Sequence, residues 1–289
     1  MPLDESPGRL FPSKTVQVRR PVDFAPHGVP INAAPRKSLT ENKDTQLNKS
    51  SNAVRLCIGL LGLFMLSGLA PSIAAAEKVP VHVRAVTWQG KILLDRTVRT
   101  GTSKVPTSSK ATCFGGSPSN GSKKVPGATA LGALKDAGAA WKPQRPLLIT
   151  NAFDFGLGIC GIGSAVAEGK EWWELTHNHK PSSLGGEGTM LERNDSVLWY
   201  LAKSFNQASP DELFLKAPQR VGKNRSFKVR VTAFNDKGKE RPVKGARLSI
   251  GGKTNAGGYT RVKLGKMTRF VARADGLIVS NRAVVRVRK

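Results

Sequence analysis

The stretch from Val79 to Arg84 reads VPVHVR, and the stretch from Phe227 to Ala233 reads FKVRVTA. Apolar residues occupy every second position in both, which is the period of a strand with one buried face. Both stretches therefore predict half-buried β-strands. They place the chain of 289 residues in the mainly β class.

The residues that follow the first stretch extend this pattern as far as about residue 202. Further strands are expected at 91–98, within 147–162, at 172–176 and at 196–201, with a turn region at 178–188. Gly, Ser, Thr and Pro dominate residues 101–127, which predicts a long loop. Residues 129–141 break the β pattern, because Leu131, Leu134 and Ala137 recur at helical spacing and Thr129 can cap the start. One helix is therefore expected.

Three segments of this part carry a resemblance: GATALGALKDAG at 127–138, WWELTHNHKPSS at 172–183 and LERNDSVLWYLA at 191–202. Together they resemble the transcobalamin C-terminal-like domain of exported bacterial proteins, over about residues 80–202. The resemblance implies an α+β, β-grasp-like domain with one helix, assigned to residues 77–210.

The family usually has Gly where this chain has His179, in a turn that needs positive φ, and commonly has Gly where this chain has Asn194. Relatives in animals bind cobalamin between this domain and a helical barrel. This sequence has no counterpart of that barrel, so no complete corrinoid site is expected.

The second stretch opens a series of short strands, expected at 246–250, 260–264, 269–274 and 283–287, with Gly- and Asn-rich turns between them. Such spacing is typical of a β-sandwich. The phrases RPVKGARLSIGGKTNAGGYTRVKL (241–264) and ADGLIVSNRAVVRV (274–287) resemble the immunoglobulin-like modules of bacterial surface proteins and adhesins. This resemblance assigns residues 211–289 to an Ig-like β-sandwich.

An export signal is expected at residues 54–76. Arg55 precedes the uncharged run CIGLLGLFMLSGLA at 57–70, and three alanines ending at Ala76 offer a cleavage site. As a helix the run measures roughly 21 Å, less than the bilayer core of about 30 Å, which favours a signal peptide over an anchor or a buried core helix. The polar residues 1–53 are expected to be a disordered leader, or to be untranslated if Val54 is the true start. The protein is thus predicted to be secreted or associated with the cell envelope.

Removal of that segment, which contains Cys57, leaves Cys113 and Cys160. Outside the cytoplasm an even pair is most simply a disulfide, and two inert buried thiols are the alternative.

Positive charge, +26 overall, is concentrated near the C-terminus. Residues 211–289 hold 21 Lys and Arg against 5 acids, whereas residues 77–210 hold 16 against 10. A basic surface is predicted from outward strand positions: Lys228, Arg230, Arg247, Arg261, Lys263, Arg286 and Arg288. It would adsorb to anionic envelope polymers or lipid headgroups, or to another surface protein, unless it is simply a solvated face. Nucleic acid is not expected, because aromatic residues are not interleaved with the charges.

Catalytic signals are weak. GLGICG at 156–161 matches G-x-G-x-x-G, but the following residues do not predict the helix that a dinucleotide site needs. His177 and His179 are interpreted as a hairpin tip and not as metal ligands. No enzymatic activity, cofactor or metal is predicted.

Five aromatic residues are candidates for either core packing or a ligand surface, with packing favoured: Phe155, Trp172, Trp173, Trp199 and Tyr200. The leading hypothesis is a non-catalytic envelope or extracellular interaction protein. A small-ligand, corrinoid-like carrier is the competing class, and a hydrolase of wall polymers is the third. An apolar cleft lined by Trp172, Trp199 or Phe155 would favour the carrier, and a closed surface would favour the interaction module.

Overall fold

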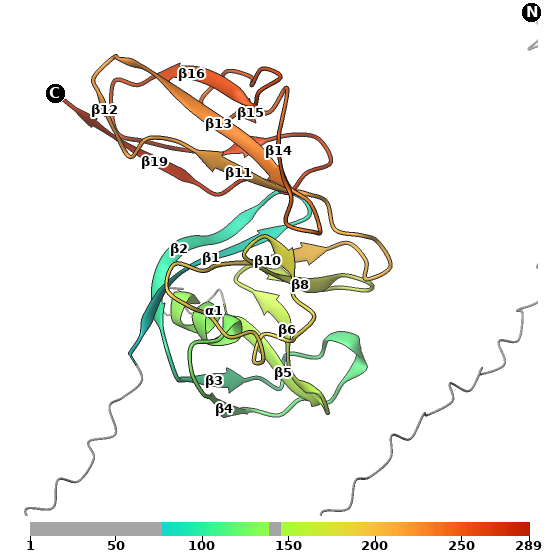
Figure 1. The fold of residues 1–289 in the computed structure, drawn as a ribbon. Helices are drawn as coiled ribbons and strands as arrows, with labels where there is room; N and C mark the ends of the chain where they lie inside the picture. The colour runs from blue at the N-terminus through green and yellow to red at the C-terminus, as the bar shows by residue number, and fades with distance from the viewer. Residues whose placement is uncertain (1–76, 139–145) are drawn as a thin grey trace, which may run out of the picture. The chain divides into compact units, whose positions relative to one another are not determined.

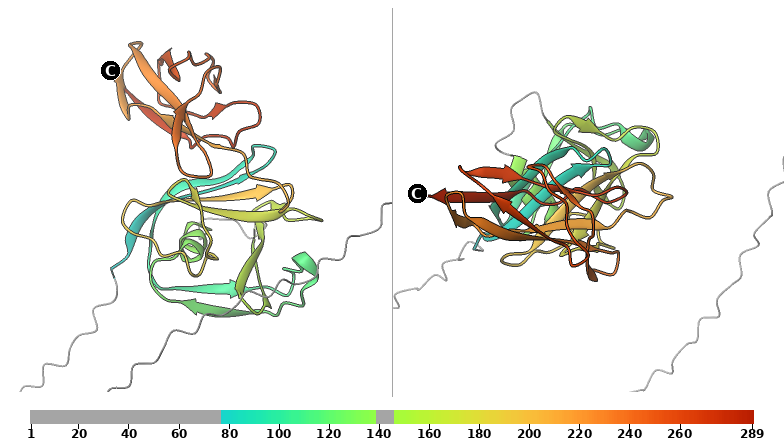
Figure 2. Two further views of the ribbon diagram at one scale, coloured as in Figure 1. Left: turned by 45° about the vertical axis from the view of Figure 1, so that its right-hand side comes forward. Right: turned by 90° about the horizontal axis from the view of Figure 1, so that it is seen from above.

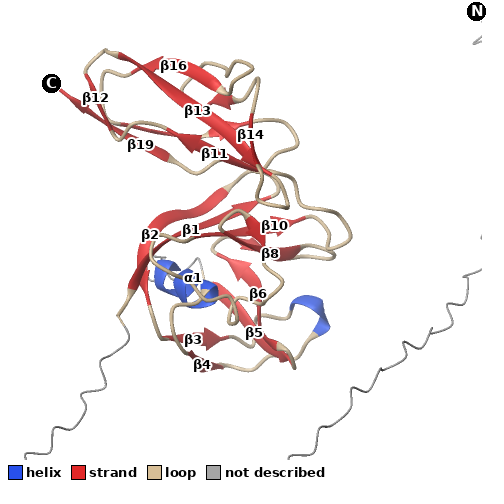
Figure 3. Ribbon diagram, in the orientation of Figure 1, coloured by secondary structure: helices blue, strands red, loops and turns tan. Residues whose placement is uncertain are grey.

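The computed structural model describes residues 77–138 and 146–289, which belong to one compact unit. Within these ranges the chain is mainly β with one α-helix, which confirms the predicted fold class (Figure 3). The predicted leader and the signal segment, with Val54, Cys57 and Ala76, lie outside the described residues. Among the helices of the described ranges, none is long and apolar enough to cross a bilayer.

A five-stranded sheet with the order β2-β1-β10-β8-β9 is the largest sheet of the N-terminal part, residues 77–202 (Figure 1). β1 pairs in parallel with β10, and the other neighbours are antiparallel. The predicted strands at 91–98, 172–176 and 196–201 are confirmed. The five strands are β1 Val79–Thr87, β2 Ile92–Thr100, β8 Trp172–His177, β9 Lys180–Pro181 and β10 Ser196–Ala202.

The predicted helix is α1, Ala130–Gly138, and residues 139–141 of the prediction lie outside the described ranges. The hydroxyl of Thr129 accepts a hydrogen bond from the backbone N–H of Gly132 at 3.1 Å, so the expected cap is present. Leu131 and Leu134 are fully buried in the main core of the N-terminal part. The helix lies between the five-stranded sheet and a hairpin, β3–β4 (Figure 2).

That hairpin corrects the expectation of a loop at residues 101–127. β3, Ser103–Thr107, pairs with β4, Gly121–Val125, and a short 3₁₀ turn, Cys113–Gly115, lies between them. Two of the buried positions of β3 are polar and are satisfied by hydrogen bonds: Ser103 donates to Asp136, and Thr107 donates to the carbonyl of Ser119. The composition of residues 101–127 predicted a loop because the inward face of β3 is not wholly apolar.

A third sheet has the order β5-β6-β7, with β5 Leu147–Phe153, β6 Gly156–Ile162 and β7 Ala165–Val166. Cys160 on β6 lies at disulfide distance from Cys113, with their Cα atoms 5.4 Å apart. This confirms the predicted pairing, and it ties the β3–β4 connection to the third sheet.

The C-terminal part, residues 212–289, contains only strands in three small sheets. β13 is its longest strand and pairs with β11, β14 and β16, while β19 pairs with β12 and β17, and β15 pairs with β18. Val229, Val231, Phe270 and Val285 lie in its core. The strands are β11 Glu212–Lys216, β12 Arg220–Gly222, β13 Ser226–Phe234, β14 Glu240–Pro242, β15 Arg247–Leu248, β16 Tyr259–Lys263, β17 Thr268–Phe270, β18 Ala272–Arg273 and β19 Ala283–Arg288.

A smaller apolar cluster joins the two parts. Val86, Leu198 and Tyr200 of the five-stranded sheet pack with Ile278 and Val279 of the C-terminal part. The first strand was predicted to be half-buried, but both of its faces are buried from residue 84 to residue 87. The reason is that the C-terminal part covers the face that a free sheet would expose to water.

Replacing both bonded cysteines, Cys113→Ser with Cys160→Ser, is expected to lower the free energy of unfolding by up to about 4 kcal/mol. The bond spans a sequence separation of 47 residues, so its loss restores entropy to the unfolded chain. Denaturant unfolding without reductant measures the difference, and reduced wild-type protein should behave like the double variant. Equal midpoints for oxidised wild type and the variant would contradict the prediction.

Candidate ligand-binding cleft

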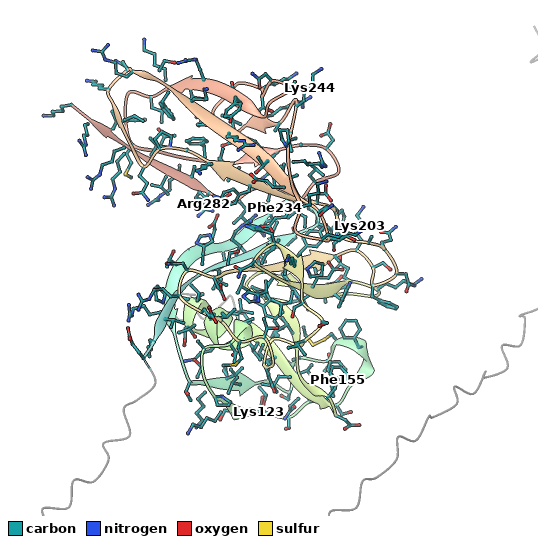
Figure 4. The ribbon with its side chains drawn as sticks, in the orientation of Figure 1. Lys123, Phe155, Lys203, Phe234, Lys244 and Arg282 are labelled. Atoms are coloured by element: carbon teal, nitrogen blue, oxygen red, sulfur yellow. A yellow bond between two sulfur atoms is a disulfide. The ribbon has the colours of Figure 1, made fainter. Side chains whose placement is uncertain are left out.

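A cleft of about 950 Å³ opens beside the five-stranded sheet, a volume within the range of small-molecule sites. Its walls come from β6, β8 and the loop at residues 182–186. Residues 208–211, which precede the C-terminal part, also line the cleft, as do Glu212 and the turn that begins at Phe234 within that part. Figure 4 labels two of the lining side chains, Phe155 at the tip of the β5–β6 hairpin and Phe234 from β13.

The cleft exists because β6 and β8 each have, on one of their two sides, a neighbouring strand that covers only part of their length. β8 pairs with β10 from end to end, but within the described ranges it pairs with β9 only at Thr176 and His177. β6 likewise pairs with β7 only at Gly161 and Ile162. The unpaired halves of both strands line the cleft, which is where a continuous sheet would place a further strand.

Phenylalanines form one rim of the cleft. Phe153 and Phe155 stack with ring centroids 4.9 Å apart, and Phe114 lies 6.2 Å from Phe153. Phe155 is 87 % exposed and Phe114 is 49 % exposed. Adjacent exposed aromatic rings at the mouth of a cleft mark an interaction site more often than a structural one.

Tryptophans form the inner wall. Trp173 and Trp199 are buried in the core of the N-terminal part, and Trp172 is half-buried on the opposite face of β8. The lining loop rests on this wall at Gly186, where a Cβ atom would lie 2.8 Å from Cη2 of Trp199. The indole Nε1 atoms of all three tryptophans are buried and have no acceptor among the described residues.

Glu174 follows Trp172 and Trp173 on β8 and lines the cleft. Burial raises its pKa from 4.5 to about 7, and no hydrogen bond or charge in the described ranges offsets this effect. Its cross-strand neighbour is Tyr200, whose pKa is raised to about 12 by burial and by the charge of Glu174. The cleft therefore holds a carboxyl group that changes its charge near neutral pH.

A buried ionic cluster lies beneath the cleft, where the two parts meet. The guanidinium of Arg84, on β1, donates to a carboxylate oxygen of Glu212 and to the carbonyl of Val279. Nδ1 of His179 lies 2.8 Å from the other oxygen of Glu212, and its ring stacks on Phe234 at 3.8 Å. His179 and Arg84 come from the N-terminal part, whereas Glu212 and Phe234 come from the C-terminal part.

The pKa of Glu212 reflects two opposed effects. Burial acts to raise this pKa, but hydrogen bonds and positive charge from His179 and Arg84 outweigh burial and lower the pKa from 4.5. Glu212 is thus held as the anion that the buried arginine needs.

The predicted aromatic residues separate into two groups. Phe155, Trp172, Trp173 and Trp199 line the cleft, whereas Tyr200 packs in the cluster that joins the two parts. The lining residues that sequence reasoning missed include Phe114, Phe153, Glu174, His179 and Phe234. Of these, Glu174 left a usable signal, because it is an acid between Trp173 and Leu175 in a predicted strand.

The predicted basic residues do not share one face. Lys228 and Arg230 on β13 lie next to Arg261 and Lys263 on β16, and the first two are placed over the ring of Tyr259. The remaining three lie on other sheets, with Arg286 and Arg288 on β19 and Arg247 on β15.

The weak catalytic signals have structural explanations. The residues of the G-x-G-x-x-G match, 156–161, lie along β6 and are followed by β7, so the helix of a dinucleotide site is missing there. Asn178 and His179 form the hairpin tip, and His177 lies 2.7 Å from Asp195. In residues 77–138 and 146–289, no group of three or more His, Cys, Asp or Glu side chains has a metal-binding arrangement.

No family model and no curated protein sequence matches this chain.

Removing the carboxylate of the buried cluster, Glu212→Gln, is expected to lower the free energy of unfolding at pH 7 by about 3–5 kcal/mol, since Arg84 keeps a buried, uncompensated charge. The difference in the free energy of unfolding between wild type and Glu212→Gln should become smaller as the pH falls. The pKa of Glu212 is below 4.5 in the folded chain, so the unfolded chain takes up the proton first, and wild type loses this stabilisation from near pH 4.5 downward.

Denaturant unfolding of both proteins between pH 7 and pH 3 gives this difference directly. Asp236→Asn, at an exposed turn residue, is the matched control and should stay close to wild type throughout. A deficit for Glu212→Gln that is the same at pH 7 and pH 3 would contradict the prediction.

Proposed function

We propose that this protein is a carrier that binds a small, largely apolar ligand in the cleft between β6, β8 and the C-terminal part. The observation that supports this proposal is that Phe155, Trp172 and Trp199 line one open cleft. An apolar cleft lined by such residues is the feature expected from the sequence to distinguish a carrier from an interaction module, which would have a closed surface.

The lining suits an apolar ligand with a few polar groups. Aromatic rings supply apolar area, worth about 25 cal/mol per Å² buried, and flat surfaces for stacking. Glu174 adds a carboxyl group to this lining. An amphiphilic ligand fits this combination better than a sugar or a polyanion.

The resemblance to transcobalamin C-terminal-like domains supports the same proposal. His179 and Asn194, which replace glycines of the family pattern, both adopt positive φ, at 65° and 71°. In this chain residues of the C-terminal part, with its proposed Ig-like fold, line the cleft together with the N-terminal part. We do not extend the proposal to a corrinoid, because the second part that lines the cleft here is built of β-sheets and not of a helical barrel.

The proposed setting is outside the cytoplasm, after removal of residues 54–76, and no catalytic step is proposed. Adsorption to anionic envelope polymers is a second, compatible function. One observation favours it: the four cations of β13 and β16 lie on neighbouring strands, and within the described ranges none of them forms an ion pair with an acid.

Titration with the neutral fluorescent probe N-phenyl-1-naphthylamine is expected to show saturable binding to the wild-type protein. Trp172→Ala should weaken binding roughly ten-fold, since it removes a stacking surface and apolar area from the wall. Trp88→Ala is the matched control, because Trp88 is 37 % exposed and does not line the cleft. Equal losses in the two variants, or no saturable binding, would contradict the proposed function.

Adsorption to anionic vesicles or wall polymer is expected to decrease as salt is raised from 0.05 to 0.5 M, since exposed charges are screened more strongly. Replacing Lys228, Arg261 and Lys263 together with Gln should reduce binding at low salt, and sedimentation measures it. The control replaces Lys104, Lys110 and Lys124, which are exposed in the N-terminal part. Adsorption that does not change with salt would contradict the role of these charges.

A further inference from the structure

The inference rests on the proposed carrier function and specifies its ligand. We propose that the cleft selects ligands that carry a positive charge on an apolar or aromatic body, such as aromatic amines or quaternary ammonium compounds.

The charges of the lining contrast with those of the whole chain. The sequence holds 46 Lys and Arg against 20 Asp and Glu. Among the described residues that line the cleft, four are acids and none is a lysine or an arginine; the acids are Glu174, Asp211, Glu212 and Asp236. This strongly basic protein therefore keeps its described lysines and arginines out of the lining of this apolar cleft, which is what a site for a cationic ligand requires.

Two of the four acids are already neutralised. Glu212 contacts Arg84 and His179, and Asp211 lies 2.8 Å from Arg241. Glu174 and Asp236 have no ion-pair partner in the described part of the chain. Asp236 is exposed in the β13–β14 turn, whereas Glu174 is half-buried within the aromatic wall. Glu174 is thus the group that a bound cation would meet away from bulk water.

The aromatic rings support the same ligand class. A cation near the face of a tryptophan is attracted by the ring's negative quadrupole, and more strongly when water is excluded. Trp172 lies two residues from Glu174 on β8, so both side chains belong to the same face of the strand. Phe234 borders the cleft from the C-terminal part. Aromatic faces beside a carboxylate are the usual surroundings of a recognised ammonium group.

The excess positive charge of the molecule does not prevent such binding. At physiological salt the Debye length is about 8 Å, so exposed lysines and arginines beyond that distance are largely screened. A carboxylate in an apolar cleft is screened much less. Selection is therefore decided by the groups inside the cleft.

Proton binding should be coupled to ligand binding at this site. The titratable groups around Glu174 are Tyr200 across the strand pair and, from the other walls, His179, Asp211, Glu212 and Asp236. With a pKa of about 7, Glu174 is mostly protonated at pH 6 and mostly ionised at pH 8. A cationic ligand should therefore bind more tightly at pH 8, and a neutral ligand of the same shape should bind equally at both.

Three ligands with one ring system test the proposal by calorimetry: 1-naphthylmethyltrimethylammonium, 1-naphthylmethanol and 1-naphthylacetate. At pH 8 and 0.15 M salt the cation is expected to bind at least ten-fold more tightly than the alcohol, and the anion to bind most weakly. Glu174→Gln should bring the cation to within three-fold of the alcohol. Glu240→Gln, the same charge change at an exposed residue outside the cleft, should keep the full preference.

The ratio of cation to alcohol affinity is taken within each variant, so a general loss of folded protein does not change it. If the alcohol binds in a Trp172-dependent way but the cation shows no preference, or if the anion binds best, the inference is overturned and the carrier proposal stands. If none of the three ligands binds, the inference is overturned, and the carrier proposal is then decided by the neutral probe.

Discussion

The contact between the two parts of the molecule depends on one buried arginine. Arg84 lies on β1 of the five-stranded sheet, on the face that a free sheet would expose to water, and it is 3 % exposed. Burying an unpaired guanidinium is very costly, so an anion has to reach it. Glu212 supplies that anion from a position 128 residues further along the chain. His179 completes the cluster and stacks on Phe234.

This cluster also determines where the cleft can form. Because Glu212 contacts Arg84, the neighbouring residues 208–211 lie beside the cleft, and they line it together with the turn that begins at Phe234. The edge halves of β6 and β8 and the tryptophans form the other walls. The cleft is therefore built jointly by both parts of the chain. Its only titratable group that is both half-buried and unpaired in the described ranges is Glu174, on the part of β8 that β9 does not cover.

A carboxyl group in such surroundings is unfavourable for folding whenever it is ionised, and replacement by an apolar residue would avoid that cost. Residues that reduce stability without a structural role are most simply explained by function. The same reasoning covers Phe155, which is largely exposed, and the three indole donors without acceptors. Core packing alone explains Trp173 and Trp199 but none of these other features.

Local pattern in the sequence determined the class of fold and many of its pieces. Alternating valines predicted β1, the spacing of Leu131 and Leu134 predicted α1, and the even cysteine pair predicted the link between Cys113 and Cys160. These predictions succeeded because strand period, helix period and capping depend on residues close together in the chain. The β3–β4 hairpin escaped prediction because buried hydroxyl groups replaced apolar residues on its inner face.

Only the tertiary structure decided that Arg84 is buried, that His179 bridges the two parts and that four acids without a lysine or arginine line the cleft in the described residues. Each of these facts depends on contacts between residues far apart in sequence. Periodicity shows which side of a strand is apolar, but it does not show which distant segment covers that side, because many segments satisfy the same burial equally well.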